Sequence, residues 1–225
     1  MSEVSVIICA FNAVKTLKET LQSIMNQTFD ATEIILVNDG STDATVDVTK
    51  EFPSVIVLNQ PHSGVGTALN LGLSKAKYEF IAFIDSDDLW TPNSLELQIA
   101  MLRKNPQASG TIGWLEEFIC PSLTFRHAAR FQPRAPQVAW INGATLIRRS
   151  LYEALGDLNT KLSMGEWIDW IARAKSEGFL FVTHQNIILK RRLHPSSLSI
   201  QRKKLPRDGM LDLVRLALDR RKSLK

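Results

Sequence analysis

The alternation of strand and helix patterns in the first hundred residues constrains the fold most. Short apolar runs that are typical of buried strands occur at residues 4–9, 33–37, 55–58 and 80–84. Helical spacing of apolar residues predicts helices at residues 14–26, 44–51 and 67–76, and a further helix that Thr91 caps and Pro92 opens. Strands that alternate with helices form mostly parallel sheets with helices on both faces. The sequence therefore predicts an α/β fold with a mostly parallel central sheet.

Polar residues follow three of these predicted strands. Asn12 comes after the first strand, Asp39 after the second, and Asp85-Ser86-Asp87-Asp88 after the fourth. In open parallel sheets, ligands bind beyond the carboxyl ends of the strands. The shared position of the polar residues predicts a ligand site at that edge of the sheet.

The second half of the chain has a less regular pattern. Strands are predicted at residues 118–130, 138–148, 179–182 and 187–193, and helices at residues 150–155 and 164–177. The sequence contains no internal repeat and no low-complexity segment. We therefore expect a single compact domain over residues 1–200, with two halves that meet near residue 100, and a tail over residues 201–225.

Composition limits the class of protein. The 225 residues are 44% hydrophobic and 22% charged, as in ordinary soluble proteins, and no run of 18 apolar residues predicts a transmembrane helix. The apolar run near the N-terminus follows Glu3 instead of a basic segment, so no signal peptide is expected. The two cysteines lack metal-ligand spacing, and Cys9 lies in a predicted core strand. These features favour a cytoplasmic protein. Without a basic groove interleaved with aromatic residues, a nucleic-acid partner is not expected.

The tail has a strong positive charge. Residues 201–225 hold nine Lys or Arg and three Asp or Glu, and Leu211, Val214 and Leu218 recur there at helical spacing. A basic amphipathic helix can lie on an anionic membrane, which would bring the protein to the inner membrane surface. Alternatively, the apolar stripe packs on the body of the protein or on the second subunit of a homodimer. The sequence favours packing, because the stripe is short and contains neither Trp nor Phe.

Residues 85–88 form the most informative single motif. Three carboxylates in four residues repel one another unless a cation is present. Oxygen ligands with no neighbouring His or Cys suit Mg²⁺ or Mn²⁺, which bridge phosphate groups. The alternative interpretation is a solvated turn whose aspartates cap the next helix.

Four segments together resemble the family 2 glycosyltransferases of the GT-A fold. They are residues 4–12 (VSVIICAFN), 33–43 (EIILVNDGSTD), 64–72 (GVGTALNLG) and 80–88 (FIAFIDSDD). The resemblance implies a DxD motif and the inverting transfer of a sugar from a nucleoside diphosphate sugar, usually a UDP-sugar, to an acceptor hydroxyl. The first half would bind the donor and the second half would face the acceptor, which could be a glycan, a lipid-linked molecule or a peptide.

The resemblance also assigns roles to individual residues. Asp39 matches a residue that contacts the nucleobase, and Asp85 matches one that faces the ribose and the metal shell. Asp87 matches the direct ligand of Mg²⁺ or Mn²⁺, and His194 could complete the metal shell while a neighbouring arginine neutralises phosphate. The predicted nucleotide-binding residues are Ala10, Phe11, Asn12, Asp39, Gly64, Asp85, Ser86 and Arg192.

The general base is expected at the start of the helix predicted for residues 164–177. This segment is similar to one in which the family has an acidic pair, although Trp167 stands where the second acid is usual. Glu166 and Asp169 lie three residues apart, on one helical face, so either could take the acceptor proton. Alternatively, both acids only favour the N-terminus of the helix.

Other functions fit the sequence less well. A nucleotidyltransferase would carry a Gly-rich phosphate loop with a basic residue near the N-terminus, and residues 10–13 contain neither. A glycoside hydrolase would have an acid pair without a nucleotide site. A protein that only binds a sugar nucleotide remains an alternative, because Trp167 and Leu69 replace an acidic and a basic residue that are common in the family.

Overall fold

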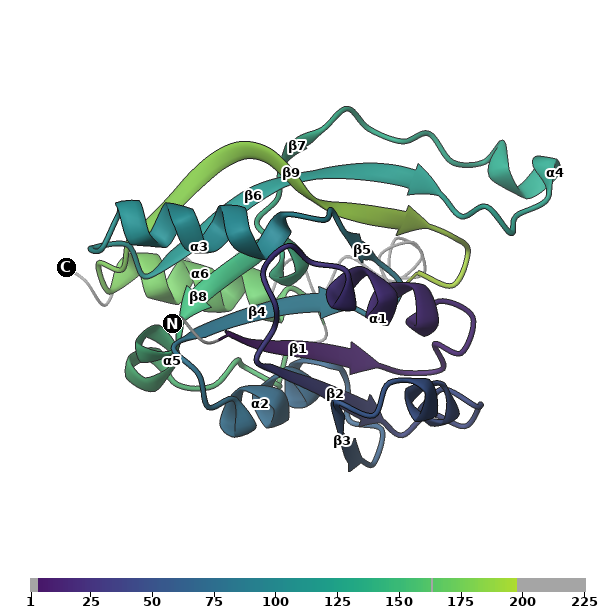
Figure 1. Cartoon of the computed structure of the whole chain (residues 1–225), viewed down its shortest axis with the longest axis horizontal. Helices are drawn as coiled ribbons and strands as arrows, with labels where there is room; N and C mark the ends of the chain where they lie inside the picture. The colour runs from purple at the N-terminus through teal and green to yellow at the C-terminus, as the bar shows by residue number, and fades with distance from the viewer. Residues whose placement is uncertain (1–3, 163, 198–225) are drawn as a thin grey trace.

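A central mixed sheet organises the chain, and a computed structural model describes it over residues 4–162 and 164–197 (Figure 1). Its strands are β1 (Val4–Ala10), β2 (Glu33–Asp39), β3 (Val55–Gln60), β4 (Phe80–Asp85), β5 (Leu89–Trp90), β6 (Gly110–Ile119), β7 (Gln137–Val138), β8 (Thr145–Arg148) and β9 (Phe181–Leu193). The tail predicted over residues 201–225 lies outside the described residues.

The strand order is β3-β2-β1-β4-β8-β6-β9-β5, and β7 pairs with β6. The first four strands in this order pair in parallel, and β8 runs antiparallel between β4 and β6. Since β6 pairs in parallel with β9, the carboxyl ends of β1, β2, β4, β6 and β9 all lie at one edge of the sheet.

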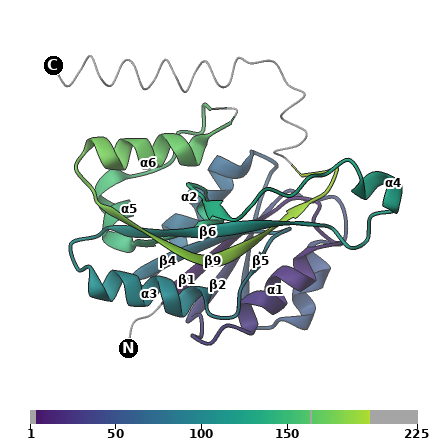
Figure 2. The same cartoon turned by 90° about the horizontal axis from the view of Figure 1, so that it is seen from above.

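Helices cover both faces of the sheet (Figure 2). The α-helices are α1 (Leu17–Met25), α2 (Val65–Lys75), α3 (Ser94–Lys104), α4 (Phe125–Ala128), α5 (Arg149–Leu155) and α6 (Glu166–Ser176), and the 3₁₀ helices are η1 (Val46–Glu51) and η2 (Asn142–Ala144). The helices α1 and α3 pack with one set of core residues, whereas α2, α5 and α6 pack with the other. None of the helices in the described residues has the length and apolar character needed to cross a membrane.

The apolar run at residues 4–10 supplies both cores because successive strand side chains point to opposite faces. Val6 and Ile8 belong to the core under α1 and α3, whereas Ile7 belongs to the core under α2. The helix α2 lies close to β1, and a Cβ at Gly72 would stand 2.5 Å from the Ile7 Cγ2 atom. A glycine at this position allows the close packing of helix on sheet.

The first half of the chain agrees closely with the sequence prediction. The four predicted strands are present as β1, β2, β3 and β4. The segment predicted as a helix over residues 44–51 is the shorter 3₁₀ helix η1, and the helix expected from Pro92 onward begins at Ser94 as α3. The short strand β5 was not predicted.

The second half required three corrections. The strand predicted over residues 118–130 is wrong: β6 ends at Ile119, and an irregular segment with three prolines and the short helix α4 follows it. The strand predicted over residues 138–148 is divided into the end of β7, η2 and β8. The two strands predicted at residues 179–193 are one long strand, β9, because its polar residues 183–186 continue the strand through an irregularity in which β9 has more residues than β6.

Candidate active site

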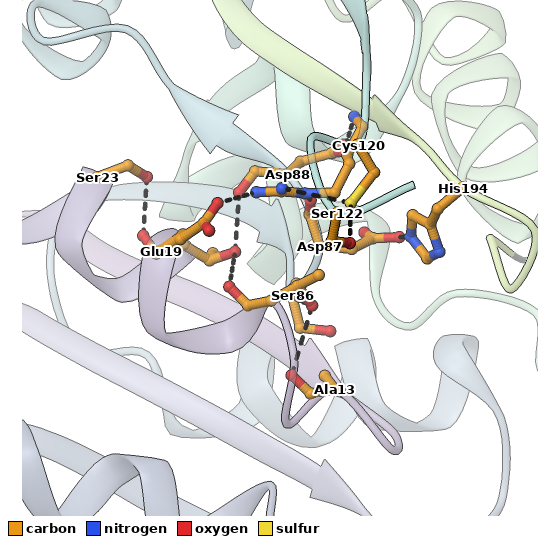
Figure 3. Close-up of polar contacts among 12 residues, drawn as sticks. Ala13, Glu19, Ser23, Ser86, Asp87, Asp88, Cys120, Ser122 and His194 are labelled. Atoms are coloured by element: carbon orange, nitrogen blue, oxygen red, sulfur yellow. Dashed lines mark hydrogen bonds and ion pairs between the residues drawn. The ribbon is translucent and has the colours of Figure 1, made fainter. Parts of the chain in front are cut away.

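Three aspartates gather where β4 ends. Oxygen atoms of Asp85, Asp87 and Asp88, the carboxylate cluster, all lie within 4.8 Å of one another. Asp88 is only 3% exposed, while Asp85 and Asp87 are half-buried. Figure 3 shows Asp87 and Asp88 beside side chains from α1 and from the segments that directly follow β6 and β9. The sheet edge therefore concentrates negative charge at one point.

The surroundings of the cluster disfavour this charge. Burial raises the pKa of Asp85 above its usual value of 3.8, the neighbouring Asp87 raises it further, and a hydrogen bond from Asn142 opposes the rise. Burial also raises the pKa of Asp88 well above 3.8, with further contributions from the other two carboxylates of the cluster. Crowded oxygen ligands whose charges are poorly compensated fit a hard divalent cation such as Mg²⁺ or Mn²⁺.

His194 joins the cluster from the residue after β9. Its Nε2 atom lies 2.9 Å from the Asp87 Oδ2 atom, and its Nδ1 atom lies 2.8 Å from the Ser196 hydroxyl. The fold thus brings together two predicted metal ligands that are 107 residues apart in the sequence. An imidazole nitrogen next to a carboxylate oxygen is a suitable additional ligand for Mn²⁺.

Arg192 lies in a different setting from the predicted phosphate contact. Its side chain is 2% exposed, and the guanidinium donates to the Glu19 carboxylate at 2.6 Å and to the Asp87 carbonyl at 2.7 Å. The Arg192 backbone N–H donates to the Asp88 carboxylate at 2.8 Å. Because the buried guanidinium donates to the Asp87 carbonyl and the backbone N–H donates to Asp88, Arg192 holds the turn that carries the carboxylate cluster. Its neighbour Arg191 has a more exposed side chain, and its charge lowers the pKa of Asp85 and Asp88.

Asp39 ends β2 and fixes the loop that precedes α2. Its carboxylate accepts hydrogen bonds from the backbone N–H groups of Ser63 at 2.8 Å and Gly64 at 2.9 Å, and from the Gln60 amide at 2.6 Å. The His62 Nδ1 atom lies 2.9 Å from the same carboxylate. Gly64 has a φ of +90°, a left-handed conformation that glycine adopts without strain, and α2 follows it. The nucleobase contact predicted for Asp39 stays a prediction.

The loop after β1 lies against the loop after β2. The Asn12 side-chain oxygen accepts a hydrogen bond from the Thr42 N–H at 2.8 Å, and the Asn12 N–H donates to the Ser41 hydroxyl at 3.0 Å. Asn12 has a φ of +51°, which asparagine tolerates better than most residues. The exposed ring of Phe11 stacks on the His62 ring, with centroids 4.0 Å apart, whereas Ala10 is buried. His62 belongs to no motif in the sequence, so only the fold reveals its position beside Phe11 and Asp39.

A cavity of about 190 Å³ lies next to the loop that Asp39 fixes. Glu166 lines it together with Ser63, Gly64, Gly66, Thr67, Thr160 and Leu162. Asp169 is not among the lining residues, and its carboxylate lies 3.8 Å from the Arg173 guanidinium on the same helix. The two acids predicted as alternative bases therefore have different surroundings. A Cβ atom at Gly66 would lie 3.2 Å from the Glu166 Cγ atom, so only a glycine leaves the present space for this side chain.

Trp167 belongs to the protein core. It is 7% exposed, stacks on Trp170 at 5.3 Å and meets the Phe83 ring edge-on at 4.8 Å. This packing explains why an aromatic residue is stable at a position where the sequence resemblance suggested an acid.

Sequence reasoning missed three side chains that support the cluster. Asn142 donates to the Asp85 carboxylate at 2.9 Å, Thr16 donates to the Ser86 carbonyl at 2.9 Å, and Thr20 donates to the Asp88 carbonyl at 2.8 Å. They come from η2 and from the start of α1, at 57 to 70 positions from their acceptors. No local pattern connects residues so distant, so the folded structure was needed to identify them.

Comparisons with known proteins agree with this geometry. The sequence profile of Glycosyl transferase family 2 matches residues 5–164. The putative glycosyltransferase EpsE of Bacillus subtilis is 31% identical over 207 residues, which cover 84% of this chain and 72% of EpsE. The chain covers only 36% and 28% of the length of two other curated glycosyltransferases that it matches.

Two solved structures share the fold. S. aureus TarS (residues 1–349) in complex with UDP-GlcNAc has a TM-score of 0.76 at 19% identity, covering 96% of this chain and 65% of the TarS chain. The mannosyltransferase PcManGT of Pyrobaculum calidifontis, in complex with GDP-Man and Mn²⁺, has a TM-score of 0.70 at 19% identity, covering 89% of this chain and 60% of its own. The likeness confirms the predicted GT-A fold.

Proposed function

Because this chain belongs to glycosyl transferase family 2 and is a glycosyltransferase, we propose that it transfers a sugar from a UDP-sugar to an acceptor hydroxyl, with inversion and with the help of a divalent cation. The half that contains β1 to β4 would bind the donor, and the half that contains β6, β8 and α6 would face the acceptor. The acceptor would be a hydroxyl of a glycan, a lipid-linked molecule or a peptide.

The carboxylate cluster is the observation that carries this proposal. Its charges lie at the edge of the sheet where the parallel strand β4 ends, and a bound cation would let these carboxylates face a diphosphate. Asp87 and His194 would hold Mg²⁺ or Mn²⁺, and Asp85 would complete the oxygen ligands from its place beside Asn142. A cation bound there would offset the negative charge that develops on the leaving diphosphate.

The neighbouring loops would hold the nucleoside. Phe11 offers an exposed ring, and Asn12 and Asp39 fix the loops on either side of it. TarS and PcManGT were solved with UDP-GlcNAc and GDP-Man, so both nucleotides occur in proteins of this fold. We favour uridine because the sequence segments resemble family members that usually take UDP-sugars.

Glu166 is the better candidate for the general base. It lines the cavity beside Gly64 and Thr67, where an acceptor hydroxyl could approach it. Asp169 is not among the residues that line the cavity, and its carboxylate lies 3.8 Å from the Arg173 guanidinium on the same helix. Proton removal by Glu166 would accompany attack of the acceptor oxygen on the anomeric carbon, from the face opposite the diphosphate, which inverts the configuration.

A donor panel tests the proposed function directly. The purified chain would be incubated with UDP-, GDP- and dTDP-sugars, each with Mn²⁺, with Mg²⁺ or with EDTA, and release of the nucleoside diphosphate would be measured. We expect release from a UDP-sugar that requires the added metal. Release from a GDP- or dTDP-sugar alone would contradict the donor assignment, and equal release in EDTA would contradict the role of the metal.

A further inference from the structure

An arm projects from the sheet between β6 and β7. It comprises residues 120–136, and the short helix α4 lies at its projecting tip. Both views show the arm extending beyond the carboxyl edge of the sheet (Figures 1 and 2). The arm begins next to the carboxylate cluster, since the Cys120 N–H donates to the carbonyl of Leu193, the residue before His194. The base of the arm therefore lies close to the candidate active site.

The surface of the arm combines one aromatic side chain with positive charge. Phe125 is 91% exposed, which makes it the most exposed large hydrophobic side chain of the described residues. Arg126, His127 and Arg130 are also exposed around α4. Residues 120–136 contain no Asp or Glu, so no acidic side chain of the arm neutralises these cations.

The base of the arm is held by an ion pair. The Glu117 side chain, only 4% exposed, accepts hydrogen bonds from the Arg134 guanidinium at 2.7 Å and from the Arg134 backbone N–H at 2.9 Å. Hydrogen bonds from Arg134 lower the pKa of Glu117 against the effect of burial, and the pair raises the pKa of Arg134. Arg134 is thus committed to holding the arm, whereas Arg126 and Arg130 face outward.

From this geometry we propose that the arm docks on an anionic lipid surface, with Phe125 inserted at the level of the head groups and Arg126 and Arg130 contacting lipid phosphates. A single aromatic side chain flanked by cations suits the boundary between head groups and acyl chains. A stable protein partner would need a much larger complementary surface than α4 offers. An anionic bilayer presents negative charge over its whole surface, so the small surface of α4 is sufficient for docking.

The proposal has a consequence for the reaction that rests on the proposed function. A docked arm would hold the edge of the sheet that carries Asp87 and His194 near the head groups, where a lipid-linked acceptor presents its sugar. Membrane binding does not itself require catalysis. Failure of the docking test would therefore leave the transferase assignment intact, and failure of the donor panel would leave the docking proposal intact.

Vesicle co-sedimentation of the full chain tests the arm. Vesicles of phosphatidylcholine with phosphatidylglycerol would be compared with vesicles of phosphatidylcholine alone. We expect Phe125→Ala to weaken binding to the anionic vesicles roughly tenfold, and Arg126→Gln and Arg130→Gln to weaken it about fivefold each. Matched controls are Leu180→Ala, an exposed apolar residue at the opposite end of the sheet, and Lys75→Gln with Lys104→Gln, exposed cations at the ends of α2 and α3.

Each outcome has one meaning. Loss of anionic binding in the arm variants, with the controls unchanged and all melting temperatures equal, supports docking by the arm. Unchanged binding in the arm variants overturns the proposal and assigns any membrane affinity to another part of the chain. Loss with the arginine variants but none with Phe125→Ala overturns insertion of the ring and indicates a purely electrostatic contact with the lipid phosphates. No binding of the parent chain to anionic vesicles at low salt also overturns the proposal.

Discussion

Two acidic loops flank β1, and their carboxylates have opposite surroundings. At the end of β2, Asp39 is surrounded by donors, including two backbone N–H groups and the Gln60 amide. At the end of β4, the carboxylates of the cluster face one another, and burial raises the pKa of Asp85 and Asp88. Both loops are rich in aspartate and follow parallel strands, yet the chain satisfies the charge of one loop and leaves that of the other largely uncompensated.

The difference separates a structural role from a binding role. A carboxylate that accepts several hydrogen bonds fixes its loop whether or not a ligand is present. Crowded carboxylates destabilise the protein unless an added cation offsets them. We therefore expect changes at Asp39 to act first on stability, and changes in the carboxylate cluster to act first on metal and donor binding.

Asp87→Ala should have the largest effect on function. It removes the predicted metal ligand that lies beside His194, so metal-dependent donor binding should be lost and turnover should fall roughly 10³-fold, which corresponds to several kcal/mol. Calorimetry with a UDP-sugar and Mn²⁺ measures the binding. Asp47→Ala, on the exposed surface of η1, is the control. Unchanged donor affinity in Asp87→Ala, together with no effect of EDTA on the parent, contradicts the metal assignment.

Glu166→Gln tests the proposed general base, which lines the cavity next to the loop that Asp39 fixes. The change keeps the shape of a side chain that lines the cavity but removes its basicity, so transfer to an acceptor should fall about 10²-fold or more while donor binding is retained. Asp169→Asn should reduce transfer less, and Glu177→Gln at the exposed end of the same helix is the control. If both acid variants transfer sugar at the parent rate, neither residue is the base.

The two loops also mark how far the sequence alone could lead. Strand periodicity and the acidic turns predicted the parallel half and placed Asp39 and Asp87 at one sheet edge, because neighbouring parallel strands end together. The sequence could not show that backbone N–H groups from residues 63 and 64 surround Asp39. Hydrogen-bond partners of this kind depend on the three-dimensional path of the loop, which a sequence pattern does not predict.

The same limit explains the errors in the second half. Strand prediction failed after Ile119 because apolar residues continue into an arm that has no partner strand along most of its length. The family resemblance predicts Arg192 as a nucleotide-binding residue, whereas its hydrogen bonds to Glu19 and to the Asp87 carbonyl are visible only in the fold. Because residues 191 and 192 are both arginine, the sequence could not show that one side chain is buried and the other more exposed.

Asp39→Ala should be the most destabilising single change in either loop. It leaves the N–H groups of Ser63 and Gly64 without their acceptor, and we expect a loss of about 2–4 kcal/mol in the free energy of unfolding. Asp39→Asn keeps one acceptor oxygen and should cost less. Urea denaturation measures both, with Asp30→Ala on the exposed surface as the control. A loss below about 0.5 kcal/mol, the usual range of surface changes, contradicts the structural role of Asp39.

The smallest effect expected is a gain in stability from Asp88→Asn without metal. The folded pKa values of Asp85 and Asp88 are raised, so their contribution to stability is fully present below the usual value of 3.8 and is lost as the pH rises through the folded values. Asparagine keeps the oxygen that accepts the Arg192 N–H but carries no charge. In EDTA at neutral pH the variant should therefore melt a few degrees higher than the parent, since 1 kcal/mol corresponds to about 2–4 °C for a domain of this size.

This gain should depend on pH and on metal in a way that a simple packing effect would not. The difference in melting temperature between Asp88→Asn and the parent should narrow as the pH falls toward 3.8, because the parent carboxyl then becomes neutral as well. Added Mn²⁺ should raise the melting temperature of the parent more than that of the variant, since the parent has the larger repulsion to relieve. Asp47→Asn, whose exposed carboxylate pairs with Lys50, should show neither trend. If Asp88→Asn is less stable than the parent at every pH, the hydrogen bonds of Asp88 stabilise the protein more than its charge destabilises it. Asp88 would then resemble Asp39, and only Asp85 and Asp87 would still differ from Asp39 in their surroundings.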